Sequence, residues 1–163
     1  MMSNLFHKCV CGKCKNESHK IFATAVENNR KLTVFNNDSS MIMIVKVDGC
    51  YYPRGKGPSK CDYLFSFEKT ECNGEIKKNH SKLLFVELKG SKGKGACDQI
   101  KSAIQNLEAV FNCSSKKKEA IIVAKSCPAA HDSSTIKEIA EMRSKFQTAV
   151  TFRTGQYEYQ HSF

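Results

Sequence analysis

The sequence predicts one mixed α/β domain in which helices flank a central β-sheet. The chain has 163 residues, which suits a single compact domain and is short for two. Its ten phenylalanines indicate a packed interior rather than disorder. Strand-like and helix-like apolar patterns alternate along the chain, without an internal repeat or a linker. We therefore divide it into a Cys-rich, basic N-terminal tail, residues 1–17, and one domain, residues 18–163.

The first half of the domain predicts a helix followed by strands. Apolar residues recur at helical spacing in "SHKIFATAVENNRK", residues 18–31, behind Ser18 as a candidate N-cap, so we expect a helix there. Runs rich in strand-forming residues then predict strands at 31–35, 41–49, 61–68 and 82–90. Asn73–Gly74, the strongest short hairpin signal, predicts that the last two strands pair as a hairpin.

The second half predicts two helices that alternate with strands. Helical spacing of apolar residues predicts a helix over 96–112, and "KKKEAIIVAKS" predicts a strand over 116–126. An amphipathic helix is expected over 133–147, capped by Ser134. Its apolar face holds Ile136, Ile139 and Met142. Residues 149–160 predict a last strand at a sheet edge.

Charge and cysteine content narrow the range of partners and compartments. Lys and Arg total 26 against 16 Asp and Glu, which gives a net charge of +10 and favours a polyanion, nucleic acid before an acidic membrane surface. The longest apolar run is far below the roughly 18 residues that a membrane span needs. Nine cysteines without a secretion signal predict a reducing, cytoplasmic location and free thiols.

Two charged residues end an otherwise apolar strand in "LLFVELKG". Glu87 and Lys89 share one face of that strand because side chains alternate. A two-residue turn at Asn73–Gly74 would pair positions that sum to 147 and would place Asp62 opposite Phe85, on the same face. A wider loop that kept this parity would bring Asp62 beside Glu87. We therefore expect Asp62, Glu87 and Lys89 to converge on one outward-facing patch of the sheet.

Such a patch has the groups needed for metal-assisted phosphodiester hydrolysis. Two carboxylates a few ångströms apart repel each other unless a cation lies between them. Their oxygens suit Mg²⁺ or Mn²⁺, which keep several waters and also bind substrate phosphate. A neighbouring lysine orients or deprotonates a metal-bound water and stabilises charge on the phosphate. The plainer alternative is a surface salt-bridge cluster on a half-exposed sheet.

The segments "KCDYLF" and, 25 residues after Asp62, "FVELKG" resemble the PD-(D/E)XK nuclease superfamily. The resemblance covers roughly residues 18–126 and implies a restriction-endonuclease-like fold with an αβββαβ core. It implies Asp62 and Glu87 as metal ligands, with the Leu88 backbone carbonyl often a third, and Lys89 as the catalytic lysine.

The resemblance also suggests two further site residues and has one visible departure. Cys61 precedes Asp62 where the family motif has proline, which many members also lack. Some members carry a glutamine on the following helix, and Gln99 is the candidate here. Many supply an acid from the first helix, and Glu27 is the only acid in that predicted helix.

Basic loops and N-terminal cysteines provide candidate contacts outside this motif. The loops "PRGKGPSK" and "SKGKG" flank the expected site, and they predict phosphate contacts rather than plain solvated turns. The basic residues concerned are Arg54, Lys56, Lys60, Lys92 and Lys94. The N-terminal segment offers possible zinc ligands, although a tail of free thiols fits it as well. Those residues are Cys9, Cys11, Cys14 and His19.

These observations lead to one main functional hypothesis and two alternatives. We expect an Mg²⁺-dependent nuclease, acting on DNA in a bacterial or phage defence or DNA-processing role, as a homodimer or with a partner protein. The first alternative is a catalytically inactive nucleic-acid-binding module of the same fold. The second is an interaction protein tethered by zinc at its N-terminal cysteines.

Overall fold

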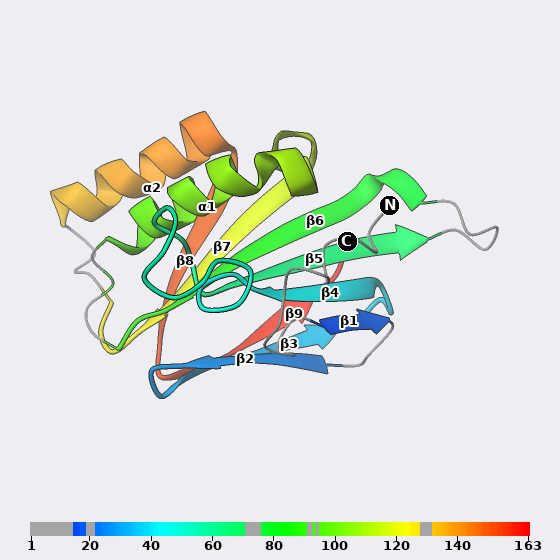
Figure 1. Ribbon diagram of the computed structural model, residues 1–163, viewed down its shortest axis with the longest axis horizontal. Coiled ribbons are helices and arrows are strands. Elements are labelled where there is room, and N and C mark those ends of the chain that lie inside the picture. The colour runs from blue at the N-terminus through cyan, green and yellow to red at the C-terminus, as the bar shows by residue number, and fades with distance from the viewer. Residues whose placement is uncertain (1–14, 19–21, 71–75, 91–92, 94, 128–131) are drawn as a thin grey trace.

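The computed structural model describes residues 15–18, 22–70, 76–90, 93, 95–127 and 132–163. These residues form three layers: two helices, a six-stranded sheet and a three-stranded sheet (Figure 1). The large sheet has the order β1-β4-β5-β6-β7-β8. Its strands are β1 (Lys15–Ser18), β4 (Met41–Lys46), β5 (Tyr63–Thr70), β6 (Ile76–Leu88), β7 (Lys117–Ala124) and β8 (Thr148–Thr154).

The two faces of the large sheet have different covers. Strands β1, β4, β5 and β6 pair antiparallel in turn, whereas β6, β7 and β8 run parallel. The parallel strands are joined by the helices α1 (Ala96–Phe111) and α2 (Ser133–Phe146), which lie on one face. A short 3₁₀ helix, Cys113–Ser115, follows α1. The small sheet, of β2 (Phe22–Glu27), β3 (Arg30–Asn36) and β9 (Gln156–His161), covers the other face.

Strand β6 is therefore buried on both sides. Leu83 and Phe85 pack in the core under the helices, whereas Leu84 and Val86 pack in the core under the small sheet. The expectation that one face of this strand turns outward is wrong, because α1 covers it. Glu87 lies on the helix side and is only 3% exposed, so the mixed α/β architecture is confirmed but the site is deeper than expected.

The predicted helix over 18–31 is wrong in the described part, where β2 and β3 form an antiparallel hairpin instead. The sequence "FATAVE" alternates exposed and buried residues along β2. Asn28 and Asn29 both adopt left-handed backbone conformations, with φ of 51° and 57°. That pair of conformations makes the two-residue turn that suits the twist of a hairpin, and asparagine tolerates it well.

The last two elements also depart from their predictions. Helix α2 is capped by Asp132, whose side chain accepts from the Thr135 backbone N–H, and not by Ser134. Only Met142 of its expected apolar face is buried, and Ile136 is 52% exposed. The single strand expected over 149–160 is two strands, because the chain turns at Gly155, where φ is +71°, and passes from the large sheet to the small one.

The β5–β6 register differs from the predicted one by two residues. Tyr63 pairs with Val86 and Leu64 with Phe85, so paired numbers sum to 149 instead of 147. An irregularity between Glu68 and Thr70 accompanies this shift, and the turn at Asn73–Gly74 lies outside the described residues. A shift of two keeps the side-chain parity. Asp62 and Glu87 consequently stay on one face, and they come level with each other.

Other predictions can be compared with the described residues. The helix over 96–112 and the five predicted strands before residue 127 all have counterparts, and β1 begins inside the predicted N-terminal tail. No described helix is both long enough and apolar enough to cross a membrane. Free thiols are carried by Cys61, Cys97, Cys113 and Cys127. Cys50 is disulfide-bonded, so the expectation of free thiols is wrong there.

Candidate active site

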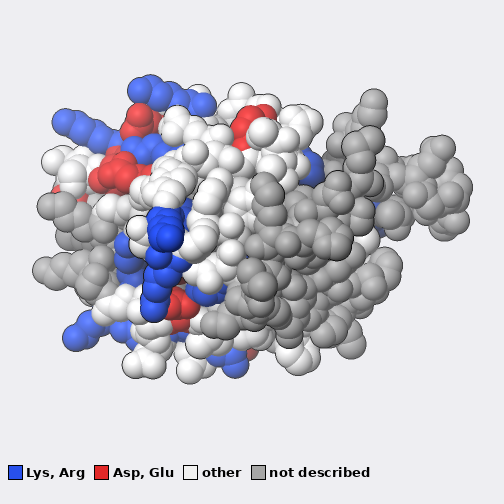
Figure 2. Space-filling model, in the orientation of Figure 1, with Lys and Arg blue, Asp and Glu red and all other residues white. Residues whose placement is uncertain are grey.

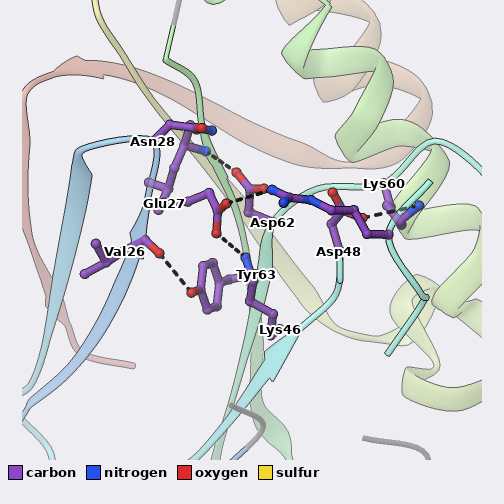
Figure 3. A network of polar contacts seen from close by, with 10 residues as sticks. Val26, Glu27, Asn28, Lys46, Asp48, Lys60, Asp62 and Tyr63 are labelled. Atoms are coloured by element: carbon purple, nitrogen blue, oxygen red, sulfur yellow. Dashed lines mark hydrogen bonds and ion pairs between the residues drawn. The ribbon is translucent and has the colours of Figure 1, made fainter. Parts of the chain in front are cut away.

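The expected acidic pair lies where β5 begins and β6 ends, and Figure 3 shows Asp62 of this pair with its surroundings. Asp62 directly precedes β5, and Glu87 is the penultimate residue of β6. Both are buried, with 8% and 3% of their surface exposed. The tip of the β2–β3 hairpin and the end of β4 reach the same place, so the large sheet and the small sheet both contribute to the site.

The backbone of Leu88 explains why Asp62 points into this site. Regular β5–β6 pairing ends at Tyr63 and Val86, which leaves the Leu88 peptide groups on that side without a strand partner. Its N–H donates to Asp62 Oδ2 at 2.7 Å, and its carbonyl oxygen accepts from Asn28 Nδ2 at 2.9 Å. Two side chains thus satisfy groups that would otherwise be orphaned at a strand end. The carbonyl expected as a metal ligand is in contact with Asn28.

Lys89 and Gln99 lie together on the helix side of the sheet. The Lys89 ammonium is 3.1 Å from Glu87 Oε1 and donates to the side-chain oxygen of Gln99. Gln99, on the first turns of α1, donates in turn from Nε2 to the Lys60 carbonyl oxygen at 3.1 Å. Gln99 therefore connects the lysine to the basic loop, and the structure brings together Asp62, Glu87, Lys89 and Gln99 as predicted.

Burial and mutual repulsion disfavour two negative charges on the acidic pair. Burial raises the pKa of Glu87 to about 7; Asp62 also raises it, whereas Lys89 opposes the shift. Burial likewise raises the pKa of Asp62, against the effect of the Leu88 N–H. Within the described residues, Glu87 Oε2 is buried without a hydrogen-bond partner. A cation between the carboxylates would relieve both conditions, so the pair fits a divalent ion.

Asp62 and Glu87 are two carboxylate ligands for such an ion. The described part of the chain has no group of three or more His, Cys, Asp or Glu residues arranged to hold a metal. A cation on Asp62 and Glu87 would therefore complete its coordination with waters and substrate oxygens, as Mg²⁺ commonly does.

Glu27 lies beside the pair, on a strand rather than on the expected helix. It ends β2 rather than a helix, and its Oε2 is 2.5 Å from the ammonium of Lys46. Its other oxygen is 3.5 Å from Arg54, whose side chain is 82% exposed. Glu27 thus has two cationic partners. A pocket of about 180 Å³ opens here, lined by Glu27, Lys46, Asp48, Gly49 and Arg54.

Three residues of this site were missed by the sequence reasoning. Lys46 is buried at the end of the apolar strand β4, 4.4 Å from the centre of the Tyr63 ring, and this position was a usable signal like that of Glu87. Asp48 pairs with Lys60 at 3.4 Å. Asn28 carries no signal in the sequence, because its segment also fits the pattern of a helix.

The basic residues predicted to contact phosphate fall into three groups. Arg54 and Lys56 are exposed on the loop beside the pocket. Lys60 is mostly buried and donates to the carbonyl oxygens of Lys56 and Pro58, so it stabilises the loop itself. Figure 2 shows Lys and Arg side chains, with Asp and Glu side chains among them, on the described part of this face. Lys92 and Lys94 lie outside the described residues.

The possible zinc ligands all come from the first nineteen residues of the chain. Cys9, Cys11, Cys14 and His19 lie outside the described residues.

The sequence was compared with protein-family models and with curated proteins. No protein-family model matches the sequence, and no curated protein matches it either.

Proposed function

We propose that this protein is a metal-dependent nuclease with a restriction-endonuclease-like core, and that DNA is its substrate. The observation that carries the proposal is the buried pair Asp62 and Glu87, with Lys89 beside it at the end of β6. Two acids are kept together in a buried position at a cost in stability, which is common at functional sites and rare elsewhere.

The chain topology supports the proposal in part. Three antiparallel strands, β4, β5 and β6, are followed by α1 and by β7 parallel to β6. This order agrees with the βββαβ part of the core that the resemblance implies. The first helix of that core has no counterpart among the described residues, where the β2–β3 hairpin covers the sheet instead.

Each side chain has a role that follows from its contacts. Asp62 and Glu87 would hold Mg²⁺ or Mn²⁺, which supplies an acidified water and stabilises charge on a phosphate. Lys89, next to Glu87, would hold the attacking water and donate to the phosphate. Gln99 orients Lys89 through its side-chain oxygen. Arg54 and Lys56 are exposed on the neighbouring loop, where they would contact the nucleic-acid backbone.

Cleavage assays with matched variants test this function. Plasmid and single-stranded DNA are incubated with Mg²⁺ or Mn²⁺ and with wild type, Lys89→Ala or Asp62→Asn. We expect wild type to cleave and each variant to lose at least about a hundredfold in rate, as removal of an essential charged group does. Glu158→Gln, an exposed acid on β9, is the control and should cleave like wild type.

The inactive nucleic-acid-binding module remains a second candidate, and one observation favours it. Lys46 already lies 2.5 Å from Glu27, so part of the acidic charge near the site is neutralised by the protein itself. For this candidate we expect wild type, Lys89→Ala and Asp62→Asn to bind DNA equally and to leave it intact with either metal.

A further inference from the structure

The tip of the β2–β3 hairpin contacts the end of β6, where the candidate site lies. Asn28 and Asn29 form the turn, and Asn28 faces Gly90, two residues after Leu88. A Cβ atom added at Gly90 would lie 3.4 Å from the Asn28 Cβ, so little space separates the turn from the end of β6. The small sheet is thus in direct contact with the backbone beside the acidic pair.

Asn28 makes a specific polar contact at this point. Its side-chain amide nitrogen donates to the Leu88 carbonyl oxygen at 2.9 Å. The backbone N–H of Leu88 donates to Asp62 Oδ2. A cation held by Asp62 and Glu87 would be close to this carbonyl, because Leu88 adjoins one acid and hydrogen-bonds to the other. The amide hydrogens carry partial positive charge, so they compete with a cation for the same oxygen and repel it electrostatically.

We propose that Asn28 sets the strength of cation binding at this site by occupying the Leu88 carbonyl oxygen. This inference rests on the proposed metal-dependent function. With the amide in place, the protein offers the cation two carboxylates and little else. Without it, the carbonyl oxygen becomes a third protein ligand.

The direction of the effect separates this role from a purely structural one. If Asn28 only held the hairpin in place, its removal would leave cation affinity unchanged or lower it. Competition for the carbonyl oxygen predicts the opposite, which is tighter binding after removal of the amide. Glycine adopts the left-handed conformation of this turn at least as readily as asparagine, so Asn28→Gly removes the amide and keeps the turn.

The experiment is a titration of the metal-free protein with Mn²⁺ alone, in which free Mn²⁺ is followed by electron paramagnetic resonance. It compares wild type, Asn28→Gly and Asn29→Gly. Asn29 occupies the same turn with φ of 57°, and its backbone oxygen accepts from its neighbour Arg30, so its variant controls for the turn. We expect Asn28→Gly to bind Mn²⁺ about fivefold more tightly than wild type, which is the change in affinity that one net hydrogen bond corresponds to. Asn29→Gly should bind Mn²⁺ as wild type does.

A second pair of variants covers the case in which Asn28→Gly does not fold. Asn28→Ala removes the amide donor without adding a charge, and Asn29→Ala makes the same truncation away from Leu88. We expect Asn28→Ala to bind Mn²⁺ more tightly than Asn29→Ala. Circular dichroism melting of each variant checks that it is folded.

The outcomes separate this inference from the function on which it rests. Equal or weaker Mn²⁺ binding by the Asn28 variants, with wild type binding normally, would overturn the role of Asn28 and leave the nuclease proposal intact. Binding by Asn28→Gly that disappears when Asp62→Asn is added would support the inference even if wild type bound too weakly to measure. Absence of Mn²⁺ binding from every variant would overturn both proposals.

Discussion

At the scale of single residues, one buried carboxylate has partners both on a neighbouring strand and in the other sheet. Lys82 on β6 lies 2.9 Å from Glu119 on β7, and Glu119 also accepts from the Tyr159 hydroxyl of the small sheet at 2.6 Å. These contacts join the two sheets far from the candidate site. Both carboxylate oxygens of Glu119 have partners, whereas Glu87 Oε2 has no hydrogen-bond partner among the described residues.

His161 is a buried titratable group at the end of β9. Its ring stacks on Phe67 with 3.8 Å between centroids, and its Nε2 is 3.6 Å from Asp38 Oδ1. Burial lowers the pKa of His161 to about 4, and Asp38 opposes this shift. The folded protein therefore keeps a neutral imidazole at pH values where an exposed histidine is protonated.

We predict that His161 makes the protein less stable in mild acid. Below pH 6.5 the unfolded chain binds a proton that the folded chain binds only near pH 4, so stability falls as the pH drops through this window. Between about pH 7.5 and about pH 5, this single group should cost the wild type about 2 kcal/mol of unfolding free energy. His161→Phe keeps an aromatic ring but cannot be protonated. Over the same pH interval, its unfolding free energy should therefore fall by about 2 kcal/mol less than that of the wild type. Urea unfolding at both pH values measures it, and equal losses in the two proteins would contradict the prediction.

At the scale of elements, the helices and strands that could be predicted from the sequence are those whose apolar residues fit either the helical period or strand alternation, but not both. Helix α1 carries seven buried residues along one face, β4, β5 and β7 are rich in β-branched and aromatic residues, and β6 ends in a buried apolar run, residues 83–86. The segment at 22–27 fits both periods, since Phe22, Ala25 and Val26 satisfy helical spacing while the same six residues alternate as a strand. Two consecutive asparagines decide for the hairpin, because both adopt positive φ.

A pair of threonine substitutions tests the hairpin directly. The predicted helix would have buried Ala25 and Val26 on one face, whereas in the strand Ala25 is fully buried and Val26 is 54% exposed. We expect Val26→Thr to change the unfolding free energy by less than about 0.5 kcal/mol. Ala25→Thr should cost about 1–3 kcal/mol, because it overpacks the core and buries a hydroxyl. Similar losses in the two variants, measured by urea unfolding, would favour a helix.

The part of the candidate site that depends on the alternation of side chains along paired strands could be predicted. The part that depends on contacts with distant elements could not. Asp62, Glu87 and Lys89 could be found because a register shift of two leaves the side-chain faces unchanged. The cover over that face, from α1, was not foreseen. Asn28 could not be found either, because it contacts Leu88 from a segment 60 positions away, which the sequence predicts as a helix and which forms a hairpin.

At the scale of the whole molecule, the site is an acidic centre inside a basic protein. The net charge of +10 favours approach of a polyanion, while Asp62 and Glu87 stay buried beneath the surface. Two buried acids without a cation between them destabilise the fold, so a bound cation would add to the stability of the entire domain. Thermal stability is therefore a measure of the site that does not depend on catalysis.

We predict that Mg²⁺ raises the melting temperature of the wild type and not that of Asp62→Asn. A ligand that binds only the folded state stabilises it by about 1.4 kcal/mol at ten times its Kd. For a chain of this size that corresponds to about 3–6 °C. Asp62→Asn removes one of the two carboxylates and should show no Mg²⁺-dependent increase, while Glu158→Gln should keep the full increase. The melts are recorded by circular dichroism in MgCl₂ and in NaCl of equal ionic strength, because screening alone also changes the repulsion among the excess lysines. An increase of the same size in NaCl, or in Asp62→Asn, would attribute the stabilisation to screening and remove the support that it gives to a cation on the acidic pair.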